Sequence, residues 1–474
     1  MIGLVEIPLL VLAWLVLLVG LIQNLIYASY LIPAWRELRD RANAHDDEAT
    51  WQALRRGDQP PITLIVPAYN EDKSIVANAH SLLSLRYSGF QVIIVNDGST
   101  DETMTRLADA LELVEIPRAP IPGLVHAEIR AIHRSAIYPN LCVVDKENGG
   151  KADAINAGLA CTRTELFCVI DADSILQPEA LVRAVQPFQD PSENVVAVGG
   201  TVGVANGCLV KHGQIDQYDL PQEFIARVQA VEYTRAFLLA RLALSRTNTL
   251  TLVSGAFGVF STRVVIGIGG FDVTTVGEDM ELIMRLHHRL RQDGIPYSMR
   301  YLPEPVCWTE VPSTLRGLSR QRIRWQRGAM ESLSRHRGMI LNPRYGRIGL
   351  VALPSMIVID VLGPVVEVLG YFLVPALALW GILDLDFLLA YLALTFGFGI
   401  FLSTASIVLE QGSIERPTTA RQLLSLAWTA VLENFGYRQL NNFWRLTGLI
   451  KHFSSTPAQW GDVGRTGFRE EDAS

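Results

Sequence analysis

The stretch Val169-Ile170-Asp171-Ala172-Asp173-Ser174 places two carboxylates directly after a run of apolar residues. The apolar run predicts a buried strand, and residues one and three of an extended segment point to the same side. Asp171 and Asp173 can therefore act together as hard oxygen ligands for Mg²⁺ or Mn²⁺, with water and substrate phosphate completing the shell. At the carboxyl end of a strand in an α/β sheet, this is where a nucleotide is expected to bind.

The same spacing recurs in Asp384-Leu385-Asp386. Asp-X-Asp is expected by chance about once in a chain this long, so the spacing alone is weak evidence. The second copy lies between two long apolar runs with no strand before it, which indicates a short loop at a membrane edge. The first copy gains its weight only from the residues that accompany it.

Composition narrows the class of protein. The chain has 474 residues, of which 49% are hydrophobic, and its mean hydropathy is +0.23. The length indicates more than one domain, and the positive hydropathy indicates that part of the chain lies in lipid. The net charge of -7 argues against a general nucleic-acid binder, so no nucleic-acid partner is expected. The five cysteines show no metal-binding spacing, which predicts buried free thiols in a reducing compartment.

Residues 1–35 are predicted to form a transmembrane anchor. Ile7–Tyr30 is almost wholly apolar and long enough to cross a bilayer. A cleaved signal peptide would have a basic start and a shorter core, whereas the only early charge here is Glu6. Three arginines follow the apolar run: Arg36, Arg39 and Arg41. The positive-inside rule then places the next domain in the cytoplasm.

Residues 346–452 are predicted to form transmembrane or interfacial helices. Ile348–Leu383 is either one long span or an interfacial helix followed by a span, and Phe387–Leu409 is a clearer span. Residues 423–450 mix apolar and polar side chains, so they either line a cavity in the membrane or lie on its surface. The tail, residues 453–474, is either a gate over the active site or a disordered end.

The middle of the chain, residues 55–313, alternates short apolar runs with helical stretches. The predicted strands are Ile62–Val66, Gln91–Val95, Leu141–Val144 and Leu166–Ile170, and the predicted helices are Lys73–Leu85, Thr100–Leu113 and Lys151–Ala160. This alternation predicts an α/β, Rossmann-like domain with a mostly parallel sheet.

Polar residues follow each of these strands. Val66–Glu71 follows the first, Asn96–Asp101 the second and Asn148–Lys151 the third. Asp97 can accept a hydrogen bond from a base or ribose, and Lys151 at a helix start suits a diphosphate. A turn with a helix cap explains any single member equally well. With Asp171 and Asp173 after the fourth strand, four such segments at successive strand ends favour a nucleotide site.

Three later segments also carry candidate residues. Leu252–Gly258 is predicted to be a strand of small residues that lines a pocket or packs tightly. Gly277–Glu281 opens a helix with acidic residues in its first turn. These acids are either simply favoured by the helix dipole, or one of them is a general base. Residues 314–345 form an amphipathic region in which Gln321, Arg324 and Trp325 share a helix face. That face suits either an anionic membrane surface or a sugar ring beside a diphosphate.

Together these motifs resemble the membrane-embedded, processive enzymes of glycosyltransferase family 2, which include the cellulose, chitin, hyaluronan and poly-N-acetylglucosamine synthases. The resemblance spans about Pro60 to Arg327 and extends to the flanking membrane segments. The motifs, in order, are Val66–Glu71, Asn96–Asp101, Lys151, Asp171-Ala172-Asp173, Glu278-Asp279 and Gln321-Arg322-Ile323-Arg324-Trp325. The last motif, Gln-Arg-X-Arg-Trp, is typical of the processive branch.

The resemblance implies a GT-A catalytic domain and a role for each matching residue. Ala68, Glu71 and Asp97 would contact the uridine end of a UDP-sugar, and Lys151 the diphosphate. Asp171 would help to hold the nucleotide-sugar and the metal, and Asp173 would ligate Mg²⁺ or Mn²⁺. Asp279 would be the catalytic base. Gln321, Arg324 and Trp325 would hold the diphosphate and frame the acceptor site.

The expected activity is polymerisation of UDP-N-acetylglucosamine or UDP-glucose into a β-linked polysaccharide that is extruded across the membrane. The expected location is the inner (plasma) membrane, multi-pass, in contact with membrane lipids. The partners are the UDP-sugar donor and the growing polysaccharide, with room for accessory export or regulatory subunits. One alternative is a non-processive family 2 transferase acting on a lipid acceptor. Another is a non-catalytic synthase subunit, which would be expected to have lost the base or the metal carboxylate.

Overall fold

The computed structural model describes residues 6–43, 51–52, 55, 57, 59–117, 119–211, 213–411, 419–454 and 469–470. Most of the tail predicted at 453–474 lies outside the described residues.

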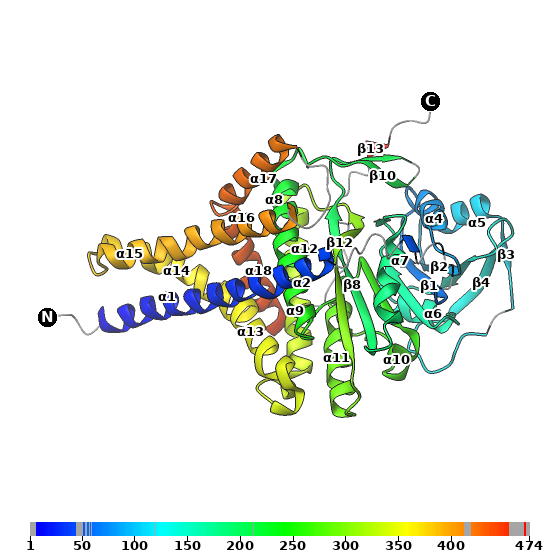
Figure 1. The fold of residues 1–474 in the computed structure, drawn as a ribbon, viewed down its shortest axis with the longest axis horizontal. Coiled ribbons are helices and arrows are strands. Elements are labelled where there is room, and N and C mark those ends of the chain that lie inside the picture. Colours follow the sequence, from blue (N-terminus) through cyan, green and yellow to red (C-terminus); the bar gives the residue numbers. More distant parts are fainter. Residues whose placement is uncertain are drawn as a thin grey trace.

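A ten-stranded sheet forms the centre of the globular part, with the order β3-β4-β5-β2-β1-β6-β11-β8-β12-β7 (Figure 1). The four adjacent strands β5, β2, β1 and β6 run parallel. Strand β11 runs antiparallel to both of its neighbours, while β8 and β12 pair in parallel. The strands are β1 (Ile62–Ala68), β2 (Phe90–Asp97), β3 (Leu113–Glu115), β4 (Ile129–Ser135), β5 (Leu141–Lys146), β6 (Leu166–Ile170), β7 (Ile175–Leu176), β8 (Val195–Val204), β11 (Phe257–Ser261) and β12 (Ser298–Thr309).

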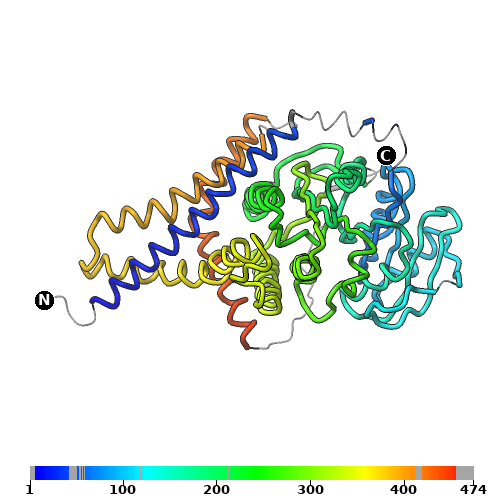
Figure 2. The backbone as a smooth tube through the Cα atoms, turned by 60° about the horizontal axis from the view of Figure 1, so that its bottom comes forward, coloured from blue at the N-terminus to red at the C-terminus, as the bar shows by residue number. Residues whose placement is uncertain are grey.

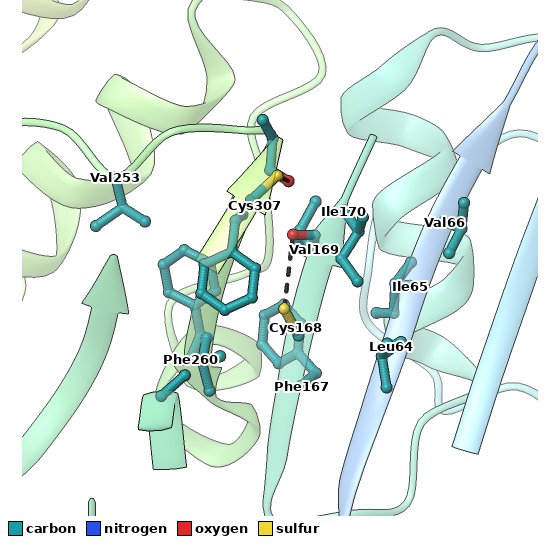
Figure 3. Close-up of a cluster of buried hydrophobic side chains, with 14 of the residues drawn as sticks. Leu64, Ile65, Val66, Phe167, Cys168, Val169, Ile170, Val253, Phe260 and Cys307 are labelled. Atoms are coloured by element: carbon teal, nitrogen blue, oxygen red, sulfur yellow. Dashed lines mark hydrogen bonds between the residues drawn. The ribbon is translucent and has the colours of Figure 1, made fainter. Parts of the chain in front are cut away.

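The predicted α/β fold with a parallel centre is confirmed, and its strands are buried on both faces. All five residues of β6 are buried, as expected for a parallel strand covered by helices. Figure 3 shows the β1 side chains Leu64, Ile65 and Val66 beside the β6 residues Phe167–Ile170. Helix α6 lies close to the sheet because Gly158 has no side chain: a Cβ there would fall 2.5 Å from a methyl carbon of Ile65.

The globular part contains the helices α4 (Ile75–Leu83), α5 (Thr103–Leu111), α6 (Lys151–Ala160), α7 (Ala180–Val185), α8 (Phe224–Tyr233), α9 (Arg241–Arg246), α10 (Thr262–Gly267), α11 (Glu278–Gln292) and α12 (Leu315–Arg335). Among these helices, α6 has the predicted bounds, whereas α4 and α5 are shorter than predicted. A π-helical segment, η2 (Thr234–Ala240), joins α8 to α9.

The prediction of a strand at Leu252–Gly258 is wrong for most of its length. Residues 252–256 form a loop and turn, and β11 begins only at Phe257. The backbone N–H of Phe257 donates to the carbonyl oxygen of Ser254 at 3.1 Å, which closes the turn. Small residues in a run fit a tight turn as well as a strand, and the long-range contacts of Gly255 described below select the turn.

Among the described residues, three helical stretches are long and apolar enough to cross a membrane, which marks the chain as a membrane protein. They are Glu6–Arg41, Ile348–Leu379 and Leu385–Gln411. They lie side by side and project from the globular part (Figure 2). Their elements are α1 (Glu6–Ser29), α2 (Leu31–Asn43), η5 (Ile348–Ala352), α13 (Leu353–Met356), η6 (Ile357–Leu362), α14 (Gly363–Leu379), α15 (Leu385–Leu392), η7 (Ala393–Gly397) and α16 (Phe398–Gln411).

The second Asp-X-Asp copy has the structural role expected of it. The backbone N–H of Phe387 donates to Oδ1 of Asp384 at 2.8 Å, so Asp384 caps the start of α15. A carboxylate that accepts from the first turn of a helix satisfies a backbone donor that the helix itself leaves unpaired.

The ambiguous stretch 423–450 forms two helices, α17 (Ala420–Leu432) and α18 (Tyr437–Phe453), separated by Gly436 at φ +99°. Helix α18 packs along α12 and α14 (Figure 1). At Gly448 the contact with α12 is close, since a Cβ there would lie 2.8 Å from Cβ of Gln326. Neither helix is among the described stretches long and apolar enough to span a membrane.

A small second sheet has the order β10-β9-β13. Strands β9 (Leu209–Lys211) and β10 (Gln214–Gln217) form an antiparallel pair, and β13 (Arg469–Glu470) pairs in parallel with β9. Two residues near the C-terminus thus return to the globular part of the molecule.

Candidate active site

The two carboxylates of the opening stretch lie at the carboxyl end of β6, as predicted. Asp173 is 7% exposed, while the side chain of Asp171 is 30% exposed. The ammonium group of Lys151, the first residue of α6, donates to Oδ1 of Asp171. Burial disfavours the charged form of Lys151, but the negative charges of Asp171 and Glu278 outweigh burial and raise its pKa.

The segments that follow Ala68 at the end of β1 and Asp97 at the end of β2 are tied together by hydrogen bonds to side chains. The backbone N–H of Thr100 donates to Oδ1 of Asn70 at 2.8 Å, and the hydroxyl of Ser99 accepts from the N–H of Asn70 at 3.0 Å. The N–H of Glu71 donates to the hydroxyl of Thr103 at 2.9 Å. The predicted nucleotide-binding segments are therefore joined to each other at the carboxyl ends of β1 and β2. Ala68 is buried at the end of β1.

Asp97 is held by donors from its own chain. The backbone N–H groups of Gly149 and Gly150 donate to its two carboxylate oxygens at 3.0 and 2.8 Å. The ammonium group of Lys146 lies 2.5 Å from Oδ1 of Asp97 and 2.6 Å from Oδ1 of Asp153. Asp97 thus shapes the glycine turn before Lys151, and its contact with uridine stays a prediction.

Lys146 is a central residue that the sequence analysis missed. Its side chain is fully buried between two buried carboxylates. A lysine at the end of a strand has no sequence signature of burial, because lysine is seldom fully buried unless it is paired. Only the pairing of β5 with β2 brings Lys146 beside Asp97.

The predicted base, Asp279, lies in the first turn of α11. Its Oδ1 accepts from the N–H of Met280 at 2.8 Å, and its Oδ2 accepts from the N–H of Gly255 at 3.2 Å. The adjacent Glu278 is buried, with Oε1 3.8 Å from Nζ of Lys151. Burial raises the pKa of Glu278 to about 7, with Asp279 acting in the same direction and Lys151 opposing it.

Helix α12 brings its Gln-Arg-X-Arg-Trp motif to the same place through a contact between two glycines. A Cβ on Gly328 would lie 2.8 Å from Cα of Gly277, so the backbone of α12 touches the start of α11 directly. Glu331 fixes the contact by accepting from the hydroxyl of Thr275 at 2.9 Å and the N–H of Val276 at 3.1 Å. The positive charge of Arg324 is close enough to act on Glu278.

Within the motif, the structure separates the exposed from the buried side chains. Trp325 is 40% exposed, and Gln321 and Arg324 are half-buried on the same side. Arg322 is buried instead: it donates to Oε2 of Glu232 at 2.7 Å, and its guanidinium carbon lies 4.5 Å from the centre of the Trp325 ring. Arg322 thus supports Trp325 from behind, a role that the helical spacing did not reveal.

The residues present fit a divalent cation. In the described part of the chain, no three or more His, Cys, Asp or Glu side chains form a metal cage. Two carboxylates at one strand end are nevertheless the protein ligands that suit Mg²⁺ or Mn²⁺ when substrate phosphate and water supply the rest. Asp171 and Asp173 provide this donor set, and Lys151 lies against Oδ1 of Asp171.

A family model described as "Glycosyltransferase like family 2" matches residues 60–328, which is more than half of the chain. The chain belongs to this family. The predicted enzyme class, a glycosyltransferase, is thereby confirmed. The matched residues begin just before β1 and end within α12, so they enclose every predicted site residue of the family 2 domain.

The chain is similar to curated family 2 synthases over part of its length. It is 27% identical over 275 residues to the poly-beta-1,6-N-acetyl-D-glucosamine synthase of Staphylococcus aureus (strain COL), which covers 58% of this chain and 56% of that protein. It is 26% identical over the same length to the corresponding synthase of Staphylococcus epidermidis. The match thus spans little more than half the length of these relatives.

One solved structure resembles almost the whole molecule. The mannosyltransferase PcManGT from Pyrobaculum calidifontis, solved in complex with GDP-Man and Mn²⁺, aligns with a TM-score of 0.53 at 16% identity, covering 93% of this chain and 100% of that chain. The predicted GT-A fold flanked by membrane helices is confirmed at the level of the fold.

Proposed function

We propose that this family 2 glycosyltransferase polymerises a UDP-activated sugar into a β-linked polysaccharide and extrudes the product across the membrane. The observation that carries the proposal is the glycine contact that places the Gln-Arg-X-Arg-Trp helix against the start of α11, where Asp279 lies. This contact supports the proposal because Trp325, the proposed acceptor platform, and Asp279, the proposed base, lie on the two helices that it joins. The name of the curated relatives supports N-acetylglucosamine, ahead of glucose, as the sugar.

The proposed chemistry is a single displacement with inversion. A hydroxyl of the acceptor sugar is a poor nucleophile, so Asp279 accepts its proton as the new bond to the anomeric carbon forms. The bond from the anomeric carbon to the diphosphate oxygen breaks, and UDP leaves with that electron pair. Lys151 stabilises the negative charge that develops on the diphosphate. A Mg²⁺ or Mn²⁺ held by Asp173 and Asp171 would supply further positive charge there.

Extrusion is supported by polar side chains among the membrane helices. Glu367 on α14 accepts from the guanidinium of Arg438 at 3.0 and 3.1 Å and from the amide of Asn442 at 2.8 Å. Gln23 and Asn24 of α1 line a small cavity together with Glu367 and Arg438. Polar residues at membrane depth usually face a bundle interior or an aqueous path. The arginines that follow α1 support a cytoplasmic catalytic domain.

Turnover by the purified full-length protein in detergent with Mn²⁺ tests the proposal. UDP release is measured with UDP-N-acetylglucosamine, UDP-glucose and UDP-glucuronate, singly and mixed, and the product is sized in the same reactions. We expect one donor to yield a long polymer and the Asp279→Asn variant to release almost no UDP. A product of one or two sugars on a lipid would favour the non-processive alternative. Absence of turnover with every donor would contradict the proposal.

A further inference from the structure

The turn at Ser254–Ala256 sits between the two groups that the proposed reaction uses. Gly255 at its centre donates its N–H to Oδ2 of Asp279 at 3.2 Å. Its carbonyl oxygen accepts from Nζ of Lys151 at 3.4 Å. One residue therefore joins the proposed base to the proposed diphosphate ligand through its own backbone.

Gly255 also allows these groups to come close to its backbone, because it has no Cβ. A Cβ on Gly255 would lie 2.8 Å from Nζ of Lys151, 3.7 Å from Cε of Lys151 and 3.6 Å from Oδ2 of Asp279. Any side chain would thus point between the ammonium and the carboxylate. In the proposed transfer, the leaving diphosphate binds on the lysine side and the acceptor hydroxyl on the aspartate side, so the spacing of these two groups governs how the reacting sugar is aligned.

The contact with Gly255 is one of two that restrain the carboxylate of Asp279. Oδ1 of Asp279 is held by the N–H of Met280 and Oδ2 by the N–H of Gly255. Lys151 is similarly restrained, because it also contacts Asp171 and lies 3.8 Å from Glu278. The turn is fixed in its place by the start of β11, where Phe257 is buried.

We propose that Gly255 is a positioning residue of the transfer reaction. It aligns Asp279 with Lys151 through its two backbone groups, and its lack of a Cβ permits the close approach of Lys151. This inference rests on the proposed function, since it assigns the base and the diphosphate ligand as stated there. Reacting groups held in the correct geometry account for a large part of enzymatic rate, and a displacement of about 1 Å can lower the rate about 100-fold.

The test is the variant Gly255→Ala in the full-length protein. Its Cβ meets the end of a flexible side chain, so we expect the variant to fold and to displace the ammonium of Lys151. We expect kcat to fall about 10- to 100-fold, with weaker binding of UDP. The matched control is Gly267→Ala at the end of α10, where a Cβ would meet no atom within 4 Å. The control should retain wild-type kcat and UDP affinity.

A double variant distinguishes positioning from a general structural effect. In a Lys151→Ala background the clash partner is absent, so Gly255→Ala should change UDP affinity less than about twofold. If Gly255→Ala alone fails to fold, the double variant should restore folding. A penalty of equal size in both backgrounds, or a single variant with wild-type kcat and UDP affinity, would overturn the proposal. A wild-type protein that turns over no donor would instead contradict the proposed function.

Discussion

The contact between Gly328 and Gly277 predicts that Gly328→Ala destabilises the protein, although helix propensity alone predicts the opposite. Alanine favours a helix interior over glycine by about 1 kcal/mol, so Gly328→Ala in α12 would be stabilising if the surroundings were open. Here the new Cβ would lie 2.8 Å from Cα and 3.0 Å from the backbone nitrogen of Gly277, at least 0.4 Å closer than the 3.4 Å at which ordinary contact begins. Backbone atoms cannot rotate away, so α12 must move relative to α11.

The expected size follows from this displacement. Overpacking of this kind typically costs about 1–3 kcal/mol, which outweighs the gain in propensity. The same movement shifts the helix that carries Arg324 and Trp325 relative to the start of α11, where Asp279 lies, and a misplacement approaching 1 Å lowers catalytic rate by up to about 100-fold. We therefore expect Gly328→Ala to reduce UDP release about 10- to 100-fold.

Two assays and one control check this reasoning. UDP release and thermal unfolding are measured for wild type, Gly328→Ala and Gly338→Ala, all full-length in the same detergent. Gly338 is exposed in the segment that follows α12, and a Cβ there would meet nothing within 4 Å. Its variant should match wild type. A Gly328→Ala protein that is as active and as stable as wild type would refute the argument that the two helices touch at these glycines.

Three further predictions concern charge. Lys146→Met should lower the free energy of unfolding by about 3–5 kcal/mol, measured by chemical denaturation, because it leaves Asp97 and Asp153 buried without a counter-charge; a loss below about 1 kcal/mol would contradict the buried triad. Asp173→Asn should weaken Mn²⁺ binding in the presence of UDP by about tenfold or more, measured by calorimetric titration, and unchanged affinity would exclude Asp173 as a ligand. Burial raises the pKa of Glu278 to about 7 from an ordinary 4.5. Between pH 4.5 and about 7 the folded state therefore binds more protons than the unfolded state, so the stability that this group contributes falls as pH rises. Glu278→Gln should remove that fall from a plot of melting temperature against pH, and an unaltered plot would show that Glu278 does not titrate in this range.

Several features of this protein follow from the sequence by itself. The apolar run before Asp171 predicts a buried strand with its carboxylates at the strand end, and the structure has β6 at Leu166–Ile170 as predicted. Helix α6 likewise begins at Lys151 and ends at Ala160. Such elements are predictable because strand and helix periodicities are local, and the order of the motifs sufficed to indicate the family.

Other features were decided only by the tertiary structure. The turn at Gly255 was predicted as a strand, because small residues fit either conformation until Lys151 and Asp279 approach from distant parts of the chain. The burial of Lys146 depends on strand pairing across the sheet.

The glycine contact between α11 and α12 is another feature that only the tertiary structure decides. Neither Gly277 nor Gly328 has a positive φ, so no local backbone requirement marks either position. Their importance comes from the short distance between two backbone segments that are remote in sequence. The hydrophobic pattern of a single chain segment does not predict such a distance. The residue types of the candidate site are therefore determined by the sequence, whereas their alignment with one another is determined by packing.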